Sequence, residues 1–216
     1  TARCMIFVTA DAERTMCTYL GSSILLGNKN LNLSIVEESK ILYLEGYLWD
    51  DNEAKKSFVK AAEVSKENGG QVALSLSDSF CVNRHRKSFQ ELIDNYIDIL
   101  FSNEEEIISL YQTSNLHEAI NLLKGKSVLS AITLGKEGSI IIKNEHLYEI
   151  PAYKLGDTVD TTGAGDLYAG GFLYGYTKGE NIIRCGNIGS LCAAHIVTHL
   201  GARAKISLST LVNTIL

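Results

Sequence analysis

The segment Val159–Glu180 reads VDTTGAGDLYAGGFLYGYTKGE and places glycines on both sides of Asp166. Glycine within regular structure costs about 0.5–1 kcal/mol relative to alanine, so a glycine cluster indicates a sharp turn or a close approach of the backbone. The apolar residues that follow predict a helix over Ala164–Thr177, with Gly163 at its start and Asp166 in its first turn. Because a helix N-terminus offers unpaired N–H groups and a partial positive charge, this segment is a candidate anion site.

A simpler interpretation makes Asp166 a helix-terminal charge, worth less than about 1 kcal/mol, with the glycines serving a tight packing contact between helix and strand. A simple cap needs one Ser, Thr or Asp, whereas Asp160–Asp166 holds four polar residues and two glycines in seven positions. We therefore favour the binding interpretation.

Strand and helix patterns alternate upstream of this segment. Short apolar runs predict strands at residues 41–46, 71–77, 98–102, 127–135, 139–143 and 145–150. Helical spacing predicts helices at residues 54–64 with a stop at 69–70, and at 84–96, 104–112, 116–123, 181–199 and 207–216. This order predicts an α/β fold with a doubly wound, mainly parallel sheet flanked by helices, which binds ligands outside the carboxyl ends of its strands. Two earlier runs, 4–9 and 15–20, predict a β-hairpin.

Composition excludes several classes of function. The net charge is −5, from 20 basic and 25 acidic residues without a basic block, which argues against nucleic acid or an anionic membrane as the main partner. No apolar run approaches the roughly 18 residues of a membrane span, and the first residues lack a signal-peptide layout. The five cysteines form no C-x-x-C pair, so we expect free, buried thiols and a reducing, cytoplasmic location.

Three further motifs each have a functional and a plain interpretation. Asn103 and Glu106, at the end of an expected strand, offer oxygen ligands that suit magnesium, or they simply cap a helix. The segment Ile132–Gly138, ITLGKEG, is a strand that runs into a glycine turn. His195 and His199 have the i, i+4 spacing of a zinc site on a helix, but no third ligand is evident, so we do not expect zinc; His195 could instead face a nucleotide.

Two familiar phosphate motifs are excluded. Gly125-Lys126-Ser127 resembles the end of a P-loop, but the required leading glycine is replaced by Ile120. A dinucleotide fingerprint that begins at Gly163 would need glycine where the sequence has Tyr168.

Together these segments resemble the ribokinase/pfkB family of ATP-dependent carbohydrate and nucleoside kinases. DTTGAGD (160–166) matches that family's C-terminal signature, NEEE (103–106) its N-x-x-E motif, and TLGKEG (133–138) its T-L-G-x-x-G motif, in the family's order. VTADAERTMCTYLG (8–21) and LYLEGYLWD (42–50) further resemble the adenosine-kinase-like and related sugar-kinase branch.

The resemblance implies a role for each matching position. Asp166 would be the general base, and the N–H groups of Gly163, Ala164 and Gly165 would form an anion hole for the transferring phosphoryl group. Magnesium would be held, largely through water, by Asn103 and Glu106, and a monovalent cation, often potassium in this family, would lie beside Asp160. The nucleotide would be lined by Thr133, Gly135 and Gly138, and the acceptor would contact Glu45 and Arg14.

The implied domain layout is a partial β lid at residues 1–22 and a ribokinase-like catalytic domain at 23–216. The resemblance covers the chain but only about the C-terminal two thirds of a typical member, so we expect the lid to be truncated and most of the acceptor site to lie outside the chain. The implied reaction moves the γ-phosphoryl of ATP to a primary hydroxyl of a sugar or nucleoside, with magnesium, in a protein that can dimerise through its lid. The alternatives are a catalytically silent nucleotide-binding fragment, and a hydrolase or synthase that uses Asp166 without ATP; the order of NEEE and TLGKEG argues against the second.

Overall fold

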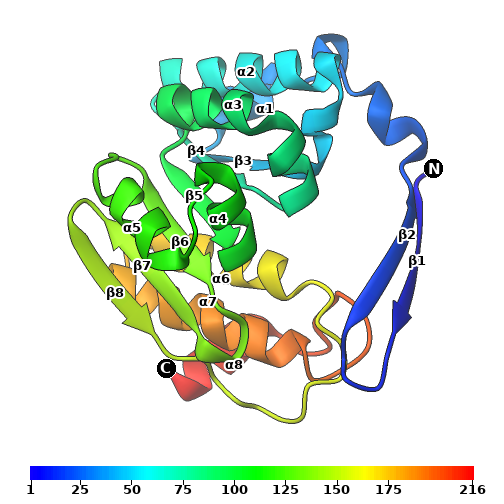
Figure 1. Cartoon of the computed structure of the whole chain (residues 1–216), viewed down its shortest axis with the longest axis vertical. Helices are drawn as coiled ribbons and strands as arrows, with labels where there is room; N and C mark the ends of the chain where they lie inside the picture. Colours follow the sequence, from blue (N-terminus) through cyan, green and yellow to red (C-terminus); the bar gives the residue numbers. More distant parts are fainter. The chain divides into compact units, whose positions relative to one another are not determined.

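A computed structural model describes all residues, 1–216, and the chain divides into two compact units (Figure 1). The first unit comprises Thr1–Ala2, Leu20–Ile132 and Ile142–Leu147. The second comprises Arg3–Tyr19, Thr133–Ile141 and Tyr148–Leu216. No helix is long and apolar enough to cross a membrane.

The main sheet has six strands in the order β3-β4-β5-β6-β7-β8. Its strands are β3 (Ile41–Glu45), β4 (Gln71–Ser75), β5 (Ile99–Asn103), β6 (Leu129–Thr133), β7 (Ser139–Lys143) and β8 (His146–Ile150). β4 pairs in parallel with β3 on one side and with β5 on the other, so these three carboxyl ends share one edge. The predicted mainly parallel α/β sheet is confirmed.

The helices cover this sheet and account for most of the remaining chain. They are α1 (Leu33–Glu38), α2 (Asn52–Glu67), α3 (Ser79–Tyr96), α4 (Glu104–Tyr111), α5 (Leu116–Lys124), α6 (Ala164–Thr177), α7 (Ile182–Ile196) and α8 (Leu208–Ile215). Short 3₁₀ turns lie at η1 (Gly21–Leu25), η2 (Asn28–Asn30), η3 (Gly46–Asp50) and η4 (Gly135–Glu137). Within the first unit, α2 packs on β3 and β4 and against α3.

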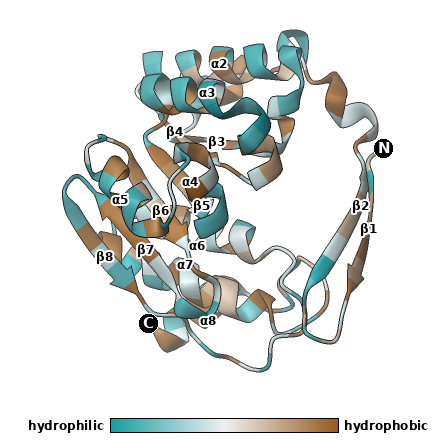
Figure 2. Ribbon diagram, in the orientation of Figure 1, coloured by the Kyte–Doolittle hydropathy of each residue, from teal (hydrophilic) through white to brown (hydrophobic).

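The central strands β4 and β5 of the first unit are largely buried because their side chains are apolar on both faces, whereas β3 is only partly buried. Val72, Ala73 and Leu74 of β4 are fully buried, as expected for a central parallel strand. In Figure 2 the strands of the sheet are largely brown, whereas α2 and α3 carry many teal turns. α2 turns a buried face that includes Phe58 to the sheet, which is the usual amphipathic arrangement of a covering helix.

Several element boundaries differ from the sequence-based expectation. α3 begins at Ser79 rather than Arg84, because the carboxylate of Asp78 accepts hydrogen bonds from the N–H groups of Phe80 (3.0 Å) and Cys81 (3.2 Å). α7 ends at Ile196, so His199 lies beyond the helix on which the zinc-like spacing was counted. The short α1 and the 3₁₀ turns of residues 21–30 have too little periodicity to be recognised in sequence.

Glycines bring α6 and α7 into close contact. A Cβ built on Gly171 of α6 would lie 2.9 Å from the Ile188 carbonyl oxygen, and one on Gly189 of α7 would lie 2.7 Å from the Tyr168 carbonyl oxygen. No larger residue fits at either position without separating the helices. Part of the glycine cluster therefore serves packing, as the simpler interpretation supposed, but between two helices rather than between a helix and a strand.

The predicted hairpin is confirmed as a two-stranded antiparallel ribbon of β1 (Arg3–Val8) and β2 (Arg14–Tyr19), in which Val8 pairs with Arg14. It also corrects the expectation for the cysteines. All five are free, but Cys4 and Cys17 are exposed on the ribbon, and only Cys81, Cys185 and Cys192 are buried. A two-stranded ribbon has too few neighbours to bury its side chains.

Candidate functional site

The N-terminus of α6 is formed by a glycine turn. Gly163 precedes the helix with a φ of +82°, and a Cβ there would lie 2.9 Å from the Cβ of Ala202, so both conformation and space require glycine. No side chain caps the helix. The position of a Cβ on Gly165 has no atom within 4 Å, so no neighbour crowds that residue, whereas the N–H of Ala164 donates to the Thr161 carbonyl at 3.2 Å. Helix N-termini of this kind are where anions commonly bind, so the anion site stays a prediction for this chain.

Asp166 lies in the first turn of α6 and is exposed. Its negative charge is favourable there, because the helix N-terminus carries a partial positive charge. The predicted place of Asp166 in the first turn of this helix is confirmed, while the function of its carboxylate and of the neighbouring N–H groups stays a prediction.

A buried carboxylate holds the segment that precedes the N-terminus of α6. Asp160 is 2 % exposed, and its Oδ1 accepts hydrogen bonds from the N–H (2.8 Å) and hydroxyl (2.6 Å) of Thr162, while its Oδ2 accepts one from the N–H of Gly201 (2.9 Å). Burial alone would raise the pKa of Asp160, but the hydrogen bonds from Thr162 and Gly201 lower it below its ordinary value. Asp160 therefore joins the turn before α6 to the segment after α7.

The turn of the hairpin contacts the same segment. Arg14 of β2 donates a hydrogen bond from its guanidinium to the Thr161 hydroxyl at 2.7 Å, and that hydroxyl donates to the carbonyl of Ala12 at 3.5 Å. Ala12 is buried although it belongs to a hairpin turn. Arg14, proposed from sequence as an acceptor contact, thus contacts Thr161, which lies one residue from Asp160 and two from Gly163 along the chain.

The proposed nucleotide residues belong to the same unit. Gly135 and Gly138 flank η4 after β6 with φ values of +58° and +97°, and the N–H of Leu134 donates to the carbonyl of Gly138 at 2.8 Å. Gly138 is required by packing, because a Cβ would lie 2.1 Å from the Ile150 carbonyl oxygen. Gly135 has open space at that position, as a residue that faces a ligand would. Thr133 is the last residue of β6.

His195 lies in the last turn of α7, near His199, at 5.2 Å between ring centroids. Its Nε2 is buried and has no hydrogen-bond partner in the structure. Burial lowers the pKa of His195, and the neighbouring His199 adds to this effect. No group of three or more His, Cys, Asp or Glu side chains is arranged to hold a metal ion.

In the first unit, Asn103 and Glu106 form a reciprocal cap at the start of α4. The N–H of Glu106 donates to Asn103 Oδ1 (2.8 Å), and Glu106 accepts from the N–H and the side-chain amide of Asn103 (both 2.9 Å). Burial raises the pKa of Glu106 to about 7, and the charges of Asp78 and Glu105 add to the rise although the Asn103 N–H opposes it. A cation would relieve this concentration of carboxylates, so the residues fit magnesium held through water.

Glu45, the other proposed acceptor contact, ends β3 and accepts a hydrogen bond from the Ser77 hydroxyl at 3.0 Å. The structure thus places Glu45, Asn103 and Glu106 in the first unit. The second unit holds the remaining predicted site residues, Arg14, Thr133, Gly135, Gly138, Asp160, Gly163, Ala164, Gly165, Asp166 and His195.

Sequence reasoning missed Ser77 and Gly201. Ser77 has no motif of its own, although its place directly after a strand at the carboxyl edge of the sheet is a signal. Gly201 is 41 residues from Asp160, so no local pattern links them.

Comparison with known proteins identifies similar proteins that are named as sugar or nucleoside kinases. The structure is similar to the crystal structure of adenosine kinase from Sinorhizobium meliloti, at 43 % identity and a TM-score of 0.96 over 99 % of this chain and 66 % of that one. A probable sugar kinase from Rhizobium etli gives 42 % identity and a TM-score of 0.96 over 99 % of this chain and 65 % of that one. In sequence, the chain is 36 % identical to a nucleoside kinase of Methanocaldococcus jannaschii over 118 residues, which are 54 % of this chain and 37 % of that protein.

The chain therefore spans less than two thirds of the length of each of these relatives. The profile of the family described as pfkB family carbohydrate kinase matches residues 1–209, nearly the whole chain. With the fold and the three motifs in their expected order, this match leads to one conclusion: the chain belongs to the pfkB family of carbohydrate kinases.

Proposed function

We propose that this chain carries the nucleotide and catalytic residues of an ATP-dependent kinase that phosphorylates a primary hydroxyl of a sugar or nucleoside. The observation that carries the proposal is the N-terminus of α6, which follows Gly163, has no side-chain cap and carries Asp166 in its first turn. Membership of the pfkB family supports the reaction class, and the likeness to an adenosine kinase and a probable sugar kinase supports both acceptor classes.

Asp166 would accept the proton of the acceptor hydroxyl as that oxygen attacks the γ-phosphorus of ATP. Because Asp166 is exposed, its carboxylate is accessible to an incoming hydroxyl, as a general base must be. The N–H groups of Gly163, Ala164 and Gly165 would receive the negative charge of the transferring phosphoryl group. Phosphoryl transfer has a loose transition state, so the chain contributes mainly by positioning and by stabilising charge.

Asn103 and Glu106 would hold magnesium, which when bound neutralises charge on the phosphates. The fit rests on the buried, acidic surroundings of Glu106. A potassium ion beside Asp160 belongs to the proposal as well. Because Asp160 already accepts three hydrogen bonds, it would act there mainly as a nearby negative charge. Thr133, Gly135, Gly138 and His195 would contact the nucleotide.

The test is Asp166→Asn in the full chain, assayed with ATP, magnesium and a panel that includes adenosine, ribose and fructose. We expect the transfer rate to fall by about 10²–10⁴, because a general base contributes that much, while the Kd for ATP from calorimetry stays within a few-fold. Asp157→Asn is the matched control, since Asp157 is exposed and makes the same charge change. Parallel loss of rate and ATP affinity would instead assign Asp166 a structural role, and ATP binding without transfer to any acceptor by the unmodified chain would favour a silent binding fragment.

A further inference from the structure

We propose that Ser77 is a positioning residue, whose hydroxyl sets the orientation of the Glu45 carboxylate so that it can bind a hydroxyl group of the sugar or ribosyl acceptor. This inference rests on the proposed function, because it takes Glu45 as an acceptor contact. It adds a residue that none of the three motifs contains, on the turn between β4 and α3.

The Ser77 hydroxyl is used both as donor and as acceptor. It donates to Glu45 Oε2 at 3.0 Å and accepts from the N–H of Gly46 at 3.1 Å. The carbonyl of Ser75, at 3.2 Å, is a second acceptor for its single proton. A carboxylate accepts more strongly than a neutral carbonyl, so the proton goes to Glu45. The two bonds therefore tie the side chain of Glu45 and the backbone of the next residue to one oxygen atom.

The backbone of Ser77 is strained. Its φ is +66°, in the left-handed region that glycine adopts freely and serine does not. The N–H of Asp78 donates to the carbonyl of Leu76 at 2.8 Å, which closes a three-residue turn around Ser77. Glycine would relieve the strain but would remove the hydroxyl. A serine at this position is therefore explained by what its hydroxyl holds.

Both partners of the Ser77–Glu45 bond are held by rigid neighbours. A Cβ on Gly46 would lie 2.3 Å from the Leu76 carbonyl oxygen, so the backbones after β3 and β4 are in contact there. The N–H of Leu76 in turn donates to the carbonyl of Phe101 in β5 at 3.0 Å. The bond between Ser77 and Glu45 thus lies on a fixed part of the sheet edge and has little freedom to drift.

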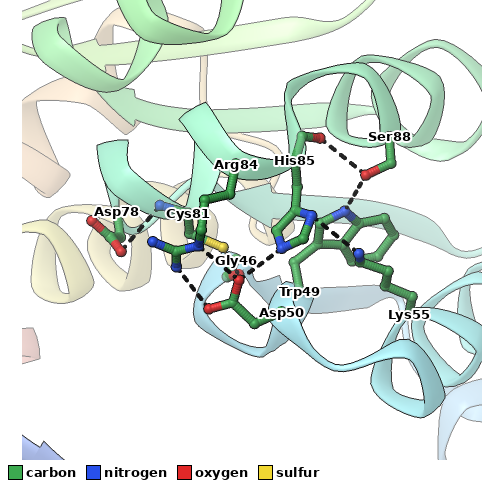
Figure 3. A network of polar contacts seen from close by, with 9 residues as sticks. All are labelled: Gly46, Trp49, Asp50, Lys55, Asp78, Cys81, Arg84, His85 and Ser88. Atoms are coloured by element: carbon green, nitrogen blue, oxygen red, sulfur yellow. Dashed lines mark hydrogen bonds and ion pairs between the residues drawn. The ribbon is translucent and has the colours of Figure 1, made fainter.

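The segments that follow the two residues are also fastened to each other (Figure 3). The Cys81 thiol of α3 donates to the Gly46 carbonyl at 3.5 Å. Asp50, at the end of η3, accepts from the Arg84 guanidinium at 2.7 and 3.1 Å and lies 2.7 Å from His85 Nε2. η3 begins directly after Glu45 and α3 begins two residues after Ser77. These contacts therefore fix the segments that follow Glu45 and Ser77 relative to each other.

The same turn reaches the proposed magnesium residues. The Ser79 hydroxyl donates to Glu105 Oε1 at 2.8 Å, next to Glu106. Ser77 and Ser79 therefore lie between the carboxylate of Glu45 at the end of β3 and the acidic start of α4 after β5. In a parallel sheet this edge is where substrates bind, so a fixed carboxylate here can accept hydrogen bonds from a sugar hydroxyl while it still accepts one from Ser77.

The test is Ser77→Gly in the full chain, with adenosine and ribose as acceptors. We expect the KM for the acceptor that is phosphorylated to rise about tenfold, while the KM for ATP changes less than twofold and kcat less than threefold. Asn144→Gly is the matched control, because Asn144 also has a positive φ, of +55°, so that the variant relieves strain without touching Glu45. In the Glu45→Gln background, Ser77→Gly should add less than a twofold change.

The outcomes separate this inference from the proposed function. An unchanged acceptor KM in an active Ser77→Gly variant overturns the positioning role and leaves the kinase assignment intact. An equal rise in both KM values also overturns it, since a structural defect would act on both substrates. If the unmodified chain transfers no phosphate, the proposed function fails, and calorimetry with adenosine or ribose then tests the positioning role. Binding that weakens about tenfold in Ser77→Gly supports that role. Binding that is absent from the unmodified chain, or unchanged in the variant, overturns it.

Discussion

Asp160→Asn tests how the segment before α6 is held. The amide oxygen of asparagine can keep the two hydrogen bonds from Thr162, but its NH₂ group then faces the N–H of Gly201, which loses its acceptor. A hydrogen bond to a charged group contributes about 1.5–3 kcal/mol, and a buried unpaired donor costs about 1–3 kcal/mol. Both figures describe the loss of the same hydrogen bond from Gly201, so they do not add in full. We therefore expect the free energy of unfolding to fall by about 2–4 kcal/mol.

Thermal and urea denaturation measure this change. For a chain of this size, each kcal/mol shifts Tm by about 2–4 °C, so we expect a decrease of about 4–16 °C. The pKa of Asp160 is lowered in the folded state, so its stabilisation is complete above the ordinary value of 3.8 and is lost as pH falls through the lowered pKa. The difference between the two proteins should therefore be constant from pH 5 to 8 and shrink below pH 3.8.

Asp157→Asn is the control, because it removes the same charge from an exposed site. If Asp160→Asn and Asp157→Asn unfold at the same urea concentration at pH 7, the three hydrogen bonds do not hold this segment and the reasoning is refuted. A difference that grows below pH 3.8 would mean that the pKa of Asp160 is raised rather than lowered.

Two further predictions concern packing and thiol chemistry. Gly171→Ala should destabilise the chain by about 1–3 kcal/mol, because its Cβ would lie 2.9 Å from the Ile188 carbonyl oxygen. Gly170→Ala, whose Cβ would have no atom within 4 Å, should stabilise the chain by up to about 1 kcal/mol. Equal effects of the two variants on urea denaturation would contradict the close contact of α6 and α7. In the native protein at pH 8, iodoacetamide should label Cys4 and Cys17, which are exposed, but not Cys81 or Cys192, in which burial raises the thiol pKa to about 11. Mass spectrometry that finds Cys81 labelled as fast as Cys4 would show that the first unit opens readily.

Much of the fold follows from local sequence. The strand at Gln71–Ser75 is recognisable because a continuous apolar run is what a strand buried on both faces requires. α6 begins at Ala164 as predicted, because Gly163 supplies the left-handed residue before an apolar helix. The start of α3 was placed too late because its first turn, Ser79–Asn83, has little apolar periodicity and depends on the cap by Asp78.

For the candidate site, the sequence by itself determined the family, the glycine turn with Asp166, and the order of the strands and helices, because these depend on neighbours within a few positions. Only the tertiary structure decided that Asp160 holds Gly201, that Arg14 contacts Thr161, and that Ser77 holds Glu45. These bonds join residues 41, 147 and 32 positions apart along the chain. A hydrogen bond forms wherever the fold brings donor and acceptor within about 3 Å, and no periodicity or local motif records which distant residues will meet.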